Sequence, residues 1–143
     1  TLAGIVLARD YYACPMAGFS IPASEHSTIT SWGKEHELDA MKNMLDQYPT
    51  GLVACVSDSF DVFRACREFW GGELRDKILH RDGTLVVRPD SGDPVTVILQ
   101  VLDILGDRFG TATNAKGYRV LDPHVRVIQG DGVDYEMIGS ILG

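Results

Sequence analysis

Short apolar runs alternate along this chain with longer stretches in which hydrophobic residues recur at helical spacing. The run at residues 52–56 predicts a strand most clearly, because an unbroken apolar run is typical of a strand covered on both faces. The predicted strands cover residues 19–21, 52–56, 85–87 and 125–128. The predicted helices cover residues 2–12, 24–32, 34–47, 60–80 with an expected break at Gly71-Gly72, 94–109, and a last segment from Asp134 onward. The mostly polar residues 111–122 predict a loop.

The helix predicted over residues 94–109 has the clearest amphipathic face. Its apolar positions follow one another at three- and four-residue steps: Ile98, Val101, Leu102, Leu105 and Phe109. Asp93 is expected as the N-cap and Pro94 as the first helical residue, which is the favoured order at a helix start. This segment therefore predicts a helix with one buried face.

Strands that alternate with helices predict an α/β fold with a parallel sheet and right-handed crossovers. A doubly wound sheet and an α/β barrel both satisfy this pattern. A complete eight-stranded barrel takes roughly 250 residues, so the 143 residues of this chain would make about half of one. Periodicity alone leaves both architectures open. The chain starts and stops inside helical patterns, and we expect it to be a fragment of a longer polypeptide.

Charge and hydropathy exclude two classes of partner. The net charge is −7, and the 13 Lys and Arg residues are scattered along the chain, so a broad nucleic-acid surface is not expected. The longest apolar stretch, residues 95–105, is interrupted by polar side chains and is too short to cross a bilayer. A small anionic ligand remains compatible, because a few aimed arginines and backbone amides can bind phosphate on an acidic protein.

The cysteines predict a reducing environment. Cys14, Cys55 and Cys66 are odd in number and have no Cys-x-x-Cys spacing. Neither a disulfide framework nor a zinc site is indicated, and the histidine spacing supports no metal cage. We therefore expect a cytoplasmic protein without a metal site built from its own side chains.

Polar and charged residues directly follow each predicted strand, in the segments 20–28, 57–61, 88–94 and 129–134. The carboxyl ends of parallel strands open onto one crevice, so one histidine, one arginine and several aspartates are expected to converge there. A purely structural explanation competes with this one. Asp58, Asp61 and Asp93 each precede a predicted helix and would serve there as ordinary N-caps.

Three of these groups carry candidate chemistry. Arg88 has a permanently charged guanidinium, and Asp90 has a carboxylate two residues later. The two side chains form either a ligand site or only a local ion pair. Residues 130–132, Gly-Asp-Gly, form either a tight turn or a loop whose amides approach a phosphate. His26 is either a structural histidine or, with adjacent Glu25 orienting its ring and raising its basicity, a phosphate contact or nucleophile.

Four segments together resemble the nicotinamide phosphoribosyltransferase family, in the family's order and at similar separations. They are Ile-Pro-Ala-Ser-Glu-His-Ser-Thr-Ile at 21–29, Ser-Asp-Ser-Phe-Asp at 57–61, Val-Arg-Pro-Asp-Ser-Gly at 87–92 and Arg-Val-Ile-Gln-Gly-Asp-Gly-Val-Asp at 126–134. The likeness runs over essentially the whole chain. The Glu25-His26 form favours the nicotinamide branch over the related nicotinate phosphoribosyltransferases, which remain the alternative together with a non-catalytic phosphoribosyl-ligand-binding domain.

The resemblance implies a type II phosphoribosyltransferase fold, with residues 1–143 forming a fragment of the α/β-barrel catalytic domain that is inactive alone. It implies a homodimer with active sites at the subunit interface. The implied reaction is a pentosyl transfer in NAD salvage, from phosphoribosyl pyrophosphate to nicotinamide, giving nicotinamide mononucleotide and pyrophosphate. Mg²⁺ would accompany the substrate, and ATP hydrolysis would be coupled through a phosphorylated histidine at the position of His26.

The resemblance also implies a role for each candidate residue. The catalytic positions would be His26, Arg88 and Asp90. Arg88 would contact the pyridine or phosphate side of the ligand, and Asp90 and Asp131 the ribose hydroxyls or the metal-bound diphosphate. The remaining substrate-binding positions would be Gly130 at the 5′-phosphate, Ser20 and Ile21 in the nicotinamide tunnel, and Asp58 and Arg126 in a second tier of the pocket.

Overall fold

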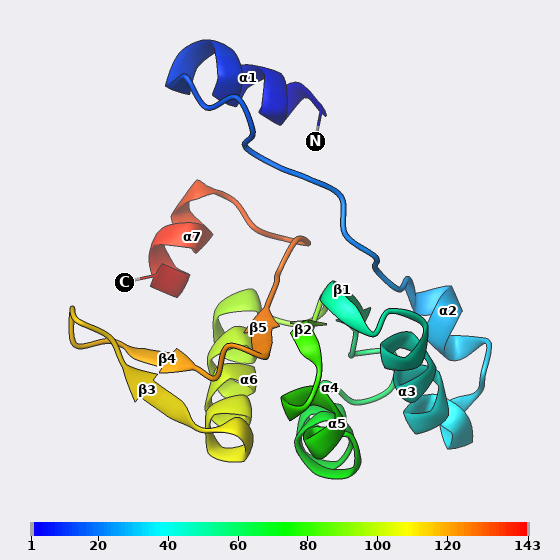
Figure 1. Ribbon diagram of the computed structural model, residues 1–143. Coiled ribbons are helices and arrows are strands. Elements are labelled where there is room, and N and C mark those ends of the chain that lie inside the picture. The colour runs from blue at the N-terminus through cyan, green and yellow to red at the C-terminus, as the bar shows by residue number, and fades with distance from the viewer. Residues whose placement is uncertain (1, 143) are drawn as a thin grey trace.

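A sheet of parallel strands forms the centre of the structure, a computed structural model that describes residues 2–142 (Figure 1). Its strands are β1 (Thr50–Val56), β2 (Asp82–Arg88) and β5 (Val125–Val127), in the order β1-β2-β5. Both strand pairs are parallel. The prediction of an α/β fold with a parallel sheet is confirmed, and so are the strands predicted at residues 52–56, 85–87 and 125–128.

The helices of the described chain are α1 (Leu2–Tyr12), α2 (His26–Thr30), the 3-10 helix η1 (Lys34–His36), α3 (Glu37–Gln47), α4 (Val62–Arg64), the π-helix η2 (Ala65–Glu73), α5 (Arg75–Leu79), α6 (Pro94–Phe109) and α7 (Tyr135–Leu142). Of these, α3, α4, α5 and α6 lie along one side of the sheet, whereas α1 lies apart from them (Figure 1). The prediction for α6 is confirmed at both ends. Asp93 caps it by accepting from the Thr96 amide at 2.9 Å.

The strand predicted at residues 19–21 is wrong. The chain instead runs beside β1 slightly later, where Ala23 and Ala54 form an isolated parallel bridge. The Ser24 amide donates to the Ala54 carbonyl at 3.0 Å, and the Ala54 amide donates to the Pro22 carbonyl at 2.9 Å. Because Pro22 has no N–H to donate, the ladder cannot extend toward residue 19 through this residue.

The loop predicted at residues 111–122 is also wrong, because this segment forms an antiparallel hairpin. Its strands are β3 (Thr111–Thr113) and β4 (Arg119–Leu121). The Asn114 side chain closes the turn by accepting from the amides of Lys116 and Tyr118 at 2.9 and 3.0 Å. Gly117 has a φ of 86°, which a glycine adopts without strain. Strands of three residues carry little apolar signal in the sequence, and here β3 is exposed and β4 only partly buried.

The helix predicted over residues 60–80 is interrupted, but not at its two glycines. Gly71 and Gly72 lie inside η2, and the turn falls at Leu74 between η2 and α5. Gly71 is needed for packing, since a β-carbon there would lie 2.5 Å from Cγ of Arg108 and 2.8 Å from the Cys66 carbonyl. The glycine pair therefore marks a close approach of η2 to α6 instead of a helix end.

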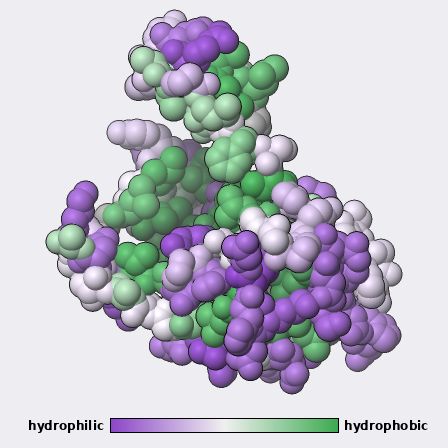
Figure 2. Space-filling view, viewed as in Figure 1, coloured by the Kyte–Doolittle hydropathy of each residue, from purple (hydrophilic) through white to green (hydrophobic). Residues whose placement is uncertain are grey.

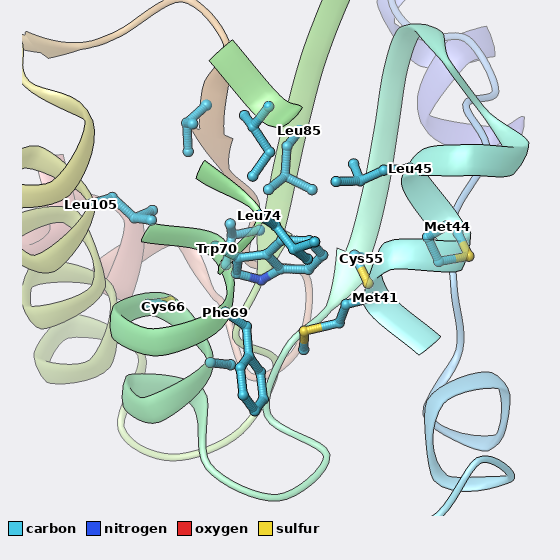
Figure 3. Packing of buried hydrophobic residues seen from close by; sticks show 14 of the residues in the cluster. Met41, Met44, Leu45, Cys55, Cys66, Phe69, Trp70, Leu74, Leu85 and Leu105 are labelled. Carbon is cyan, nitrogen blue, oxygen red and sulfur yellow. The ribbon is translucent and has the colours of Figure 1, made fainter. Parts of the chain in front are cut away.

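The hydrophobic core lies between the sheet and the helices α3, η2 and α6. Trp70 is fully buried at its centre, with Phe69, Leu74, Met41 and Leu85 among the surrounding side chains (Figure 3). The Trp70 indole keeps its hydrogen bond by donating to Ser57 Oγ at 3.0 Å. This bond joins the core to the end of β1, where the candidate site begins.

The hydrophilic residues gather over the region of α3, α4 and α5, whereas hydrophobic residues gather over α7 and the part of the molecule that faces it (Figure 2). None of the residues of α1 is buried, and α1 lies apart from the sheet (Figure 1). Among the described residues, no helix combines the length and the hydropathy needed to cross a membrane.

Candidate functional site

A pocket of about 440 Å³ opens at the carboxyl ends of the strands, as the strand-end rule predicts. β1 and β2 are in register so that Ala54 lies beside Val86 and Val56 beside Arg88. The wall combines apolar and charged groups: Ile21, Ala23, Ala54, Arg88, Asp90, Ile128, Gly130 and Asp131. The segments after β1, β2 and β5 thus meet around one cavity, as expected from their places in the sequence.

Arg88 and Asp90 form a two-pronged ion pair in this pocket. Arg88 Nε donates to Asp90 Oδ1 and Arg88 Nη2 donates to Asp90 Oδ2, both at 2.9 Å. These charge-assisted bonds lower the pKa of the Asp90 carboxyl and raise the pKa of the Arg88 guanidinium. The Asp90 side chain is only 14% exposed and the Arg88 side chain 24%. Asp90 is therefore held ionised, with its carboxylate fixed in direction.

His26 lies next to this ion pair and is bonded to Asp58. His26 Nε2 is 2.9 Å from Asp58 Oδ1, and His26 Nδ1 is 4.0 Å from Asp90 Oδ2. The Asp58 side chain is 4% exposed, whereas the His26 side chain is 44% exposed. An ionised carboxylate only accepts hydrogen bonds, so Asp58 favours the tautomer with the proton on Nε2 and leaves the Nδ1 lone pair available.

The prediction that Glu25 orients the His26 ring is wrong, since Asp58 occupies that role. The Oε1 atom of Glu25 instead lies 3.6 Å from Arg88 Nη1. Adjacent residues at a helix start point in different directions, so sequence neighbours need not share a contact. Glu25 adds negative charge beside Arg88 instead.

Two buried serines hold the backbone on which His26 and Asp58 stand. Ser24 Oγ accepts from the Val56 amide at 2.9 Å, which fixes the chain just before His26 against β1. The Ser57 amide donates to the Arg88 carbonyl at 2.9 Å, which ties the residue before Asp58 to the end of β2. His26, Asp58 and Arg88 are consequently placed by one connected set of hydrogen bonds.

The capping explanation applies to Asp61 and Asp93, but the Asp58 side chain is directed to His26. Asp61 Oδ1 accepts from the Arg64 amide at 3.0 Å at the start of α4. The ion-pair explanation for Arg88 and Asp90 is also realised, although the pair lines the pocket. The capping explanation therefore holds at Asp61 and Asp93, while at Arg88 and Asp90 the ion pair and the pocket lining occur together.

The Gly130-Asp131-Gly132 turn lines the pocket but does not begin a helix. α7 starts at Tyr135, and Asp134 caps it by accepting from the Met137 amide at 2.8 Å. The position of a β-carbon on Gly130 would meet nothing within 4 Å, so the backbone there is accessible to a ligand. Any phosphate contact would therefore depend on the turn's amides and not on the α7 dipole.

Gln129 lies beside the pocket without lining it, and the sequence suggested no role for it. It lies in the same segment as Gly130, directly after β5, and its side-chain amide bonds to the backbone of Asp90 and Asp131. The apolar residues Ala23 and Ile128 line the cavity without having been singled out. In the sequence, only their position next to the polar strand ends indicated that they would line the site.

Ser20 and Arg126 do not lie in this pocket. Ser20 lines a separate hollow formed with α1 and the segment that follows it. The Arg126 guanidinium donates through Nη1 to the carbonyls of Asp122 and Val125 at 2.7 and 2.6 Å. Arg126 lines a neighbouring groove between β4, β5, α6 and α7 instead. The other predicted site residues are at or beside the cavity.

The arrangement combines groups that suit an anionic sugar ligand. Arg88 and the open turn at Gly130 offer donors to phosphate, while Asp90 and Asp131 offer carboxylates. Among the described residues, no three acidic, histidine or cysteine side chains form a metal-binding cluster. Mg²⁺ is often held by one or two carboxylates together with substrate phosphates, and Asp90 and Asp131 fit that mode.

Comparisons with known proteins show the family of this chain. The profile of the nicotinate phosphoribosyltransferase (NAPRTase) family matches residues 3–143. The chain is 56% identical to a nicotinamide phosphoribosyltransferase of Xanthomonas campestris over 99% of its length, and 37% and 34% identical to those of Mycoplasma pneumoniae and Acinetobacter baylyi over 89% and 94%. It spans 31% of the length of each of these relatives. The chain belongs to the nicotinate phosphoribosyltransferase family.

Proposed function

We propose that this chain carries part of the active site of a nicotinamide phosphoribosyltransferase. The reaction transfers the phosphoribosyl group from phosphoribosyl pyrophosphate to nicotinamide and releases nicotinamide mononucleotide and pyrophosphate. The observation that carries the proposal is the convergence of His26, Asp58, Arg88 and Asp90 on a pocket that Gly130 and Asp131 complete. The names of the relatives favour nicotinamide over nicotinate as the acceptor.

Charge complementarity supports this reaction. Loss of pyrophosphate leaves positive charge on the ribose, and carboxylates fixed nearby stabilise that charge. Asp90 suits this role because Arg88 keeps it ionised and immobile. The Arg88 guanidinium and the amides around Gly130 suit the opposite role at the phosphates. Mg²⁺ bound with the substrate at Asp90 and Asp131 would neutralise charge on the leaving pyrophosphate.

His26 is proposed as the residue that couples ATP to the reaction. Its ring is open to solvent on one side and bonded to buried Asp58 on the other. With the Nε2 proton directed at Asp58, the Nδ1 lone pair, 4.0 Å from Asp90 Oδ2, can attack the γ-phosphorus of ATP, with ADP as the leaving group. Asp58 would then stabilise the positive charge that the ring acquires.

The remaining elements of the proposal concern the whole protein. We propose that the parallel sheet is part of a type II α/β barrel in the catalytic domain, which is consistent with helices on one side of the sheet and a pocket at the strand ends. We also propose a cytoplasmic homodimer. The free thiols of Cys55 and Cys66, within the described part of the chain, suit a reducing compartment.

The proposal is tested by product formation with the full-length protein. Nicotinamide and nicotinate are each supplied with phosphoribosyl pyrophosphate and Mg²⁺, with and without ATP, to the wild type and to His26→Ala. We expect nicotinamide mononucleotide from the wild type, and loss of the ATP stimulation in the variant. Product from nicotinate alone would move the protein to the sister activity, and no product from either would leave a domain that binds without turnover.

A further inference from the structure

Asp90 has an unusual backbone conformation at the centre of the candidate site. Its φ is 64°, in the left-handed region that L-residues rarely adopt. Such a conformation persists where surrounding contacts enforce it. Pro89 precedes Asp90 and is buried, and the neighbouring Ser91 amide donates to the Pro89 carbonyl at 2.8 Å. These contacts close a tight turn but leave the Asp90 amide to find a partner elsewhere.

Gln129 supplies that partner from the adjacent strand end. Its Oε1 accepts from the Asp90 amide at 3.2 Å, and its Nε2 lies 3.5 Å from the Asp90 carbonyl. The same Nε2 donates to the Asp131 carbonyl at 2.8 Å. A side-chain amide carries the same donor and acceptor as a peptide unit. The Gln129 side chain therefore continues the hydrogen bonding between the β2 and β5 segments beyond the point where their backbone pairing ends.

The Gln129 side chain connects the two segments that bear the acidic groups of the pocket. On one side it holds Asp90, whose carboxylate is shared between Arg88 at 2.9 Å and His26 at 4.0 Å. On the other side it holds the carbonyl of Asp131, next to the accessible turn at Gly130. A displacement of Gln129 would shift both segments relative to each other, and with them the two carboxylates.

We propose that Gln129 is a positioning residue of the transferase, which acts through the backbone of Asp90 to place its carboxylate. The inference rests on the proposed function for its catalytic consequence. The chemistry is specific to glutamine. A methionine has similar length but neither donor nor acceptor, and a glutamate keeps the acceptor for the Asp90 amide but loses the donor for the Asp131 carbonyl. An asparagine is one methylene shorter and spans less of the gap.

The first test is a double-mutant cycle in the full-length protein, with Gln129→Met, Asp90→Asn and the double variant. Misplacing a reacting group by about 1 Å costs on the order of 100-fold in rate, so we expect Gln129→Met to lower kcat/KM for phosphoribosyl pyrophosphate by a factor of that order. Gln129→Glu should fall between methionine and wild type. In the Asp90→Asn background the methionine should have little further effect, because Gln129 acts through that carboxylate. Equal losses in both backgrounds would overturn the proposal.

The second test does not depend on turnover and so separates this inference from the proposed function. Hydrogen–deuterium exchange over residues 88–93 should be faster in Gln129→Met than in wild type, because the Asp90 amide loses its acceptor. Gln47→Met is the matched control, since Gln47 is exposed at the end of α3 and bonds only weakly to Asn43 at 3.5 Å. Unchanged exchange in Gln129→Met would overturn the positioning role. An inactive wild type with faster exchange in the variant would overturn the transferase proposal alone.

Discussion

His26 and Asp58 are 32 positions apart in the sequence, yet their side chains meet at 2.9 Å between Nε2 and Oδ1. The same chemical pair occurs on the surface, where His36 Nδ1 lies 2.9 Å from Asp39 Oδ2. The two pairs differ in burial, because the Asp58 side chain is 4% exposed and the Asp39 side chain 59%. A buried carboxylate holds a ring in one tautomer and direction far more strictly than a solvated one.

We predict that Asp58→Asn reduces the ATP-stimulated formation of nicotinamide mononucleotide by about 100-fold, which is the scale of a lost proton-transfer or orienting group. An asparagine amide can donate to Nε2 and so favours the opposite tautomer, with the proton on Nδ1. Asp39→Asn is the matched control and should behave as wild type. An Asp58→Asn enzyme with full ATP stimulation would show that the pair is only structural.

A second prediction concerns the two-pronged ion pair between Arg88 and Asp90. In Arg88→Lys a single ammonium replaces the planar group that bonds both carboxylate oxygens, so Asp90 becomes mobile and its pKa rises toward the ordinary value. We expect kcat/KM for phosphoribosyl pyrophosphate to fall by roughly 10-fold or more. Because the lowered pKa keeps Asp90 ionised into acid, the acidic limb of the pH profile should move to higher pH in the variant.

The control for this prediction is Arg119→Lys. Arg119 pairs with Asp103 at 3.2 Å, and both side chains are more than 70% exposed. Exposed pairs contribute little, so activity and its pH profile should be unchanged. If Arg88→Lys keeps the wild-type acidic limb, Asp90 is not the group whose ionisation supports the reaction.

The parallel sheet and α6 could be predicted because their signals are local. Unbroken apolar runs mark β1 and β2, apolar residues on both sides of Arg126 mark β5, and the order Asp93-Pro94 marks the start of α6. The hairpin of β3 and β4 could not be predicted in this way. Its strands are three residues long, β3 is exposed and β4 is only partly buried, so burial leaves no periodic pattern in them.

The strand-end rule also brought the main pocket residues together, but it could not assign their partners. Glu25 is adjacent to His26 in sequence and yet contacts Arg88, whereas the bond to Asp58 depends on how α2 lies against β1. The role of Gln129 depends on the positive φ of Asp90, which no local pattern announces. Contacts of this kind are set by tertiary packing.

A third prediction concerns Glu37, whose side chain is 1% exposed and whose Oε1 has no hydrogen-bond partner. Burial raises the pKa of this carboxyl, although nearby Arg64 opposes the shift. A raised folded-state pKa means that stability is lost as pH rises above the ordinary glutamate value. Glu37→Gln should therefore raise the free energy of unfolding at pH 7 by on the order of 1 kcal/mol.

Thermal or denaturant unfolding at several pH values tests this sign. The gain should shrink as the pH falls and vanish below the ordinary glutamate pKa, where the wild-type side chain is protonated in both the folded and unfolded states. Glu35→Gln, at an exposed position, should show no comparable change. A Glu37→Gln protein that is less stable at pH 7 would mean that the attraction to Arg64 outweighs the cost of burial.

The last prediction concerns the opposite end of the sheet, where Arg81 ties the α3–β1 connection to β2. The Arg81 side chain is 7% exposed and donates to three backbone carbonyls, those of Tyr48, Thr50 and Gly51. The strands approach closely here, since a β-carbon on Gly83 would lie 2.1 Å from the Gly51 carbonyl oxygen.

Arg81→Met removes all of these donors and should destabilise the full-length protein by about 3 kcal/mol, because bonds to a charged donor contribute more than neutral ones. Arg75→Met, which removes one exposed bond to the Arg108 carbonyl, should cost about 1 kcal/mol or less. Folded Arg81→Met protein should keep the wild-type kcat, since Arg81 lies away from the pocket, and a loss of kcat without a loss of stability would contradict this division between the two ends of the sheet.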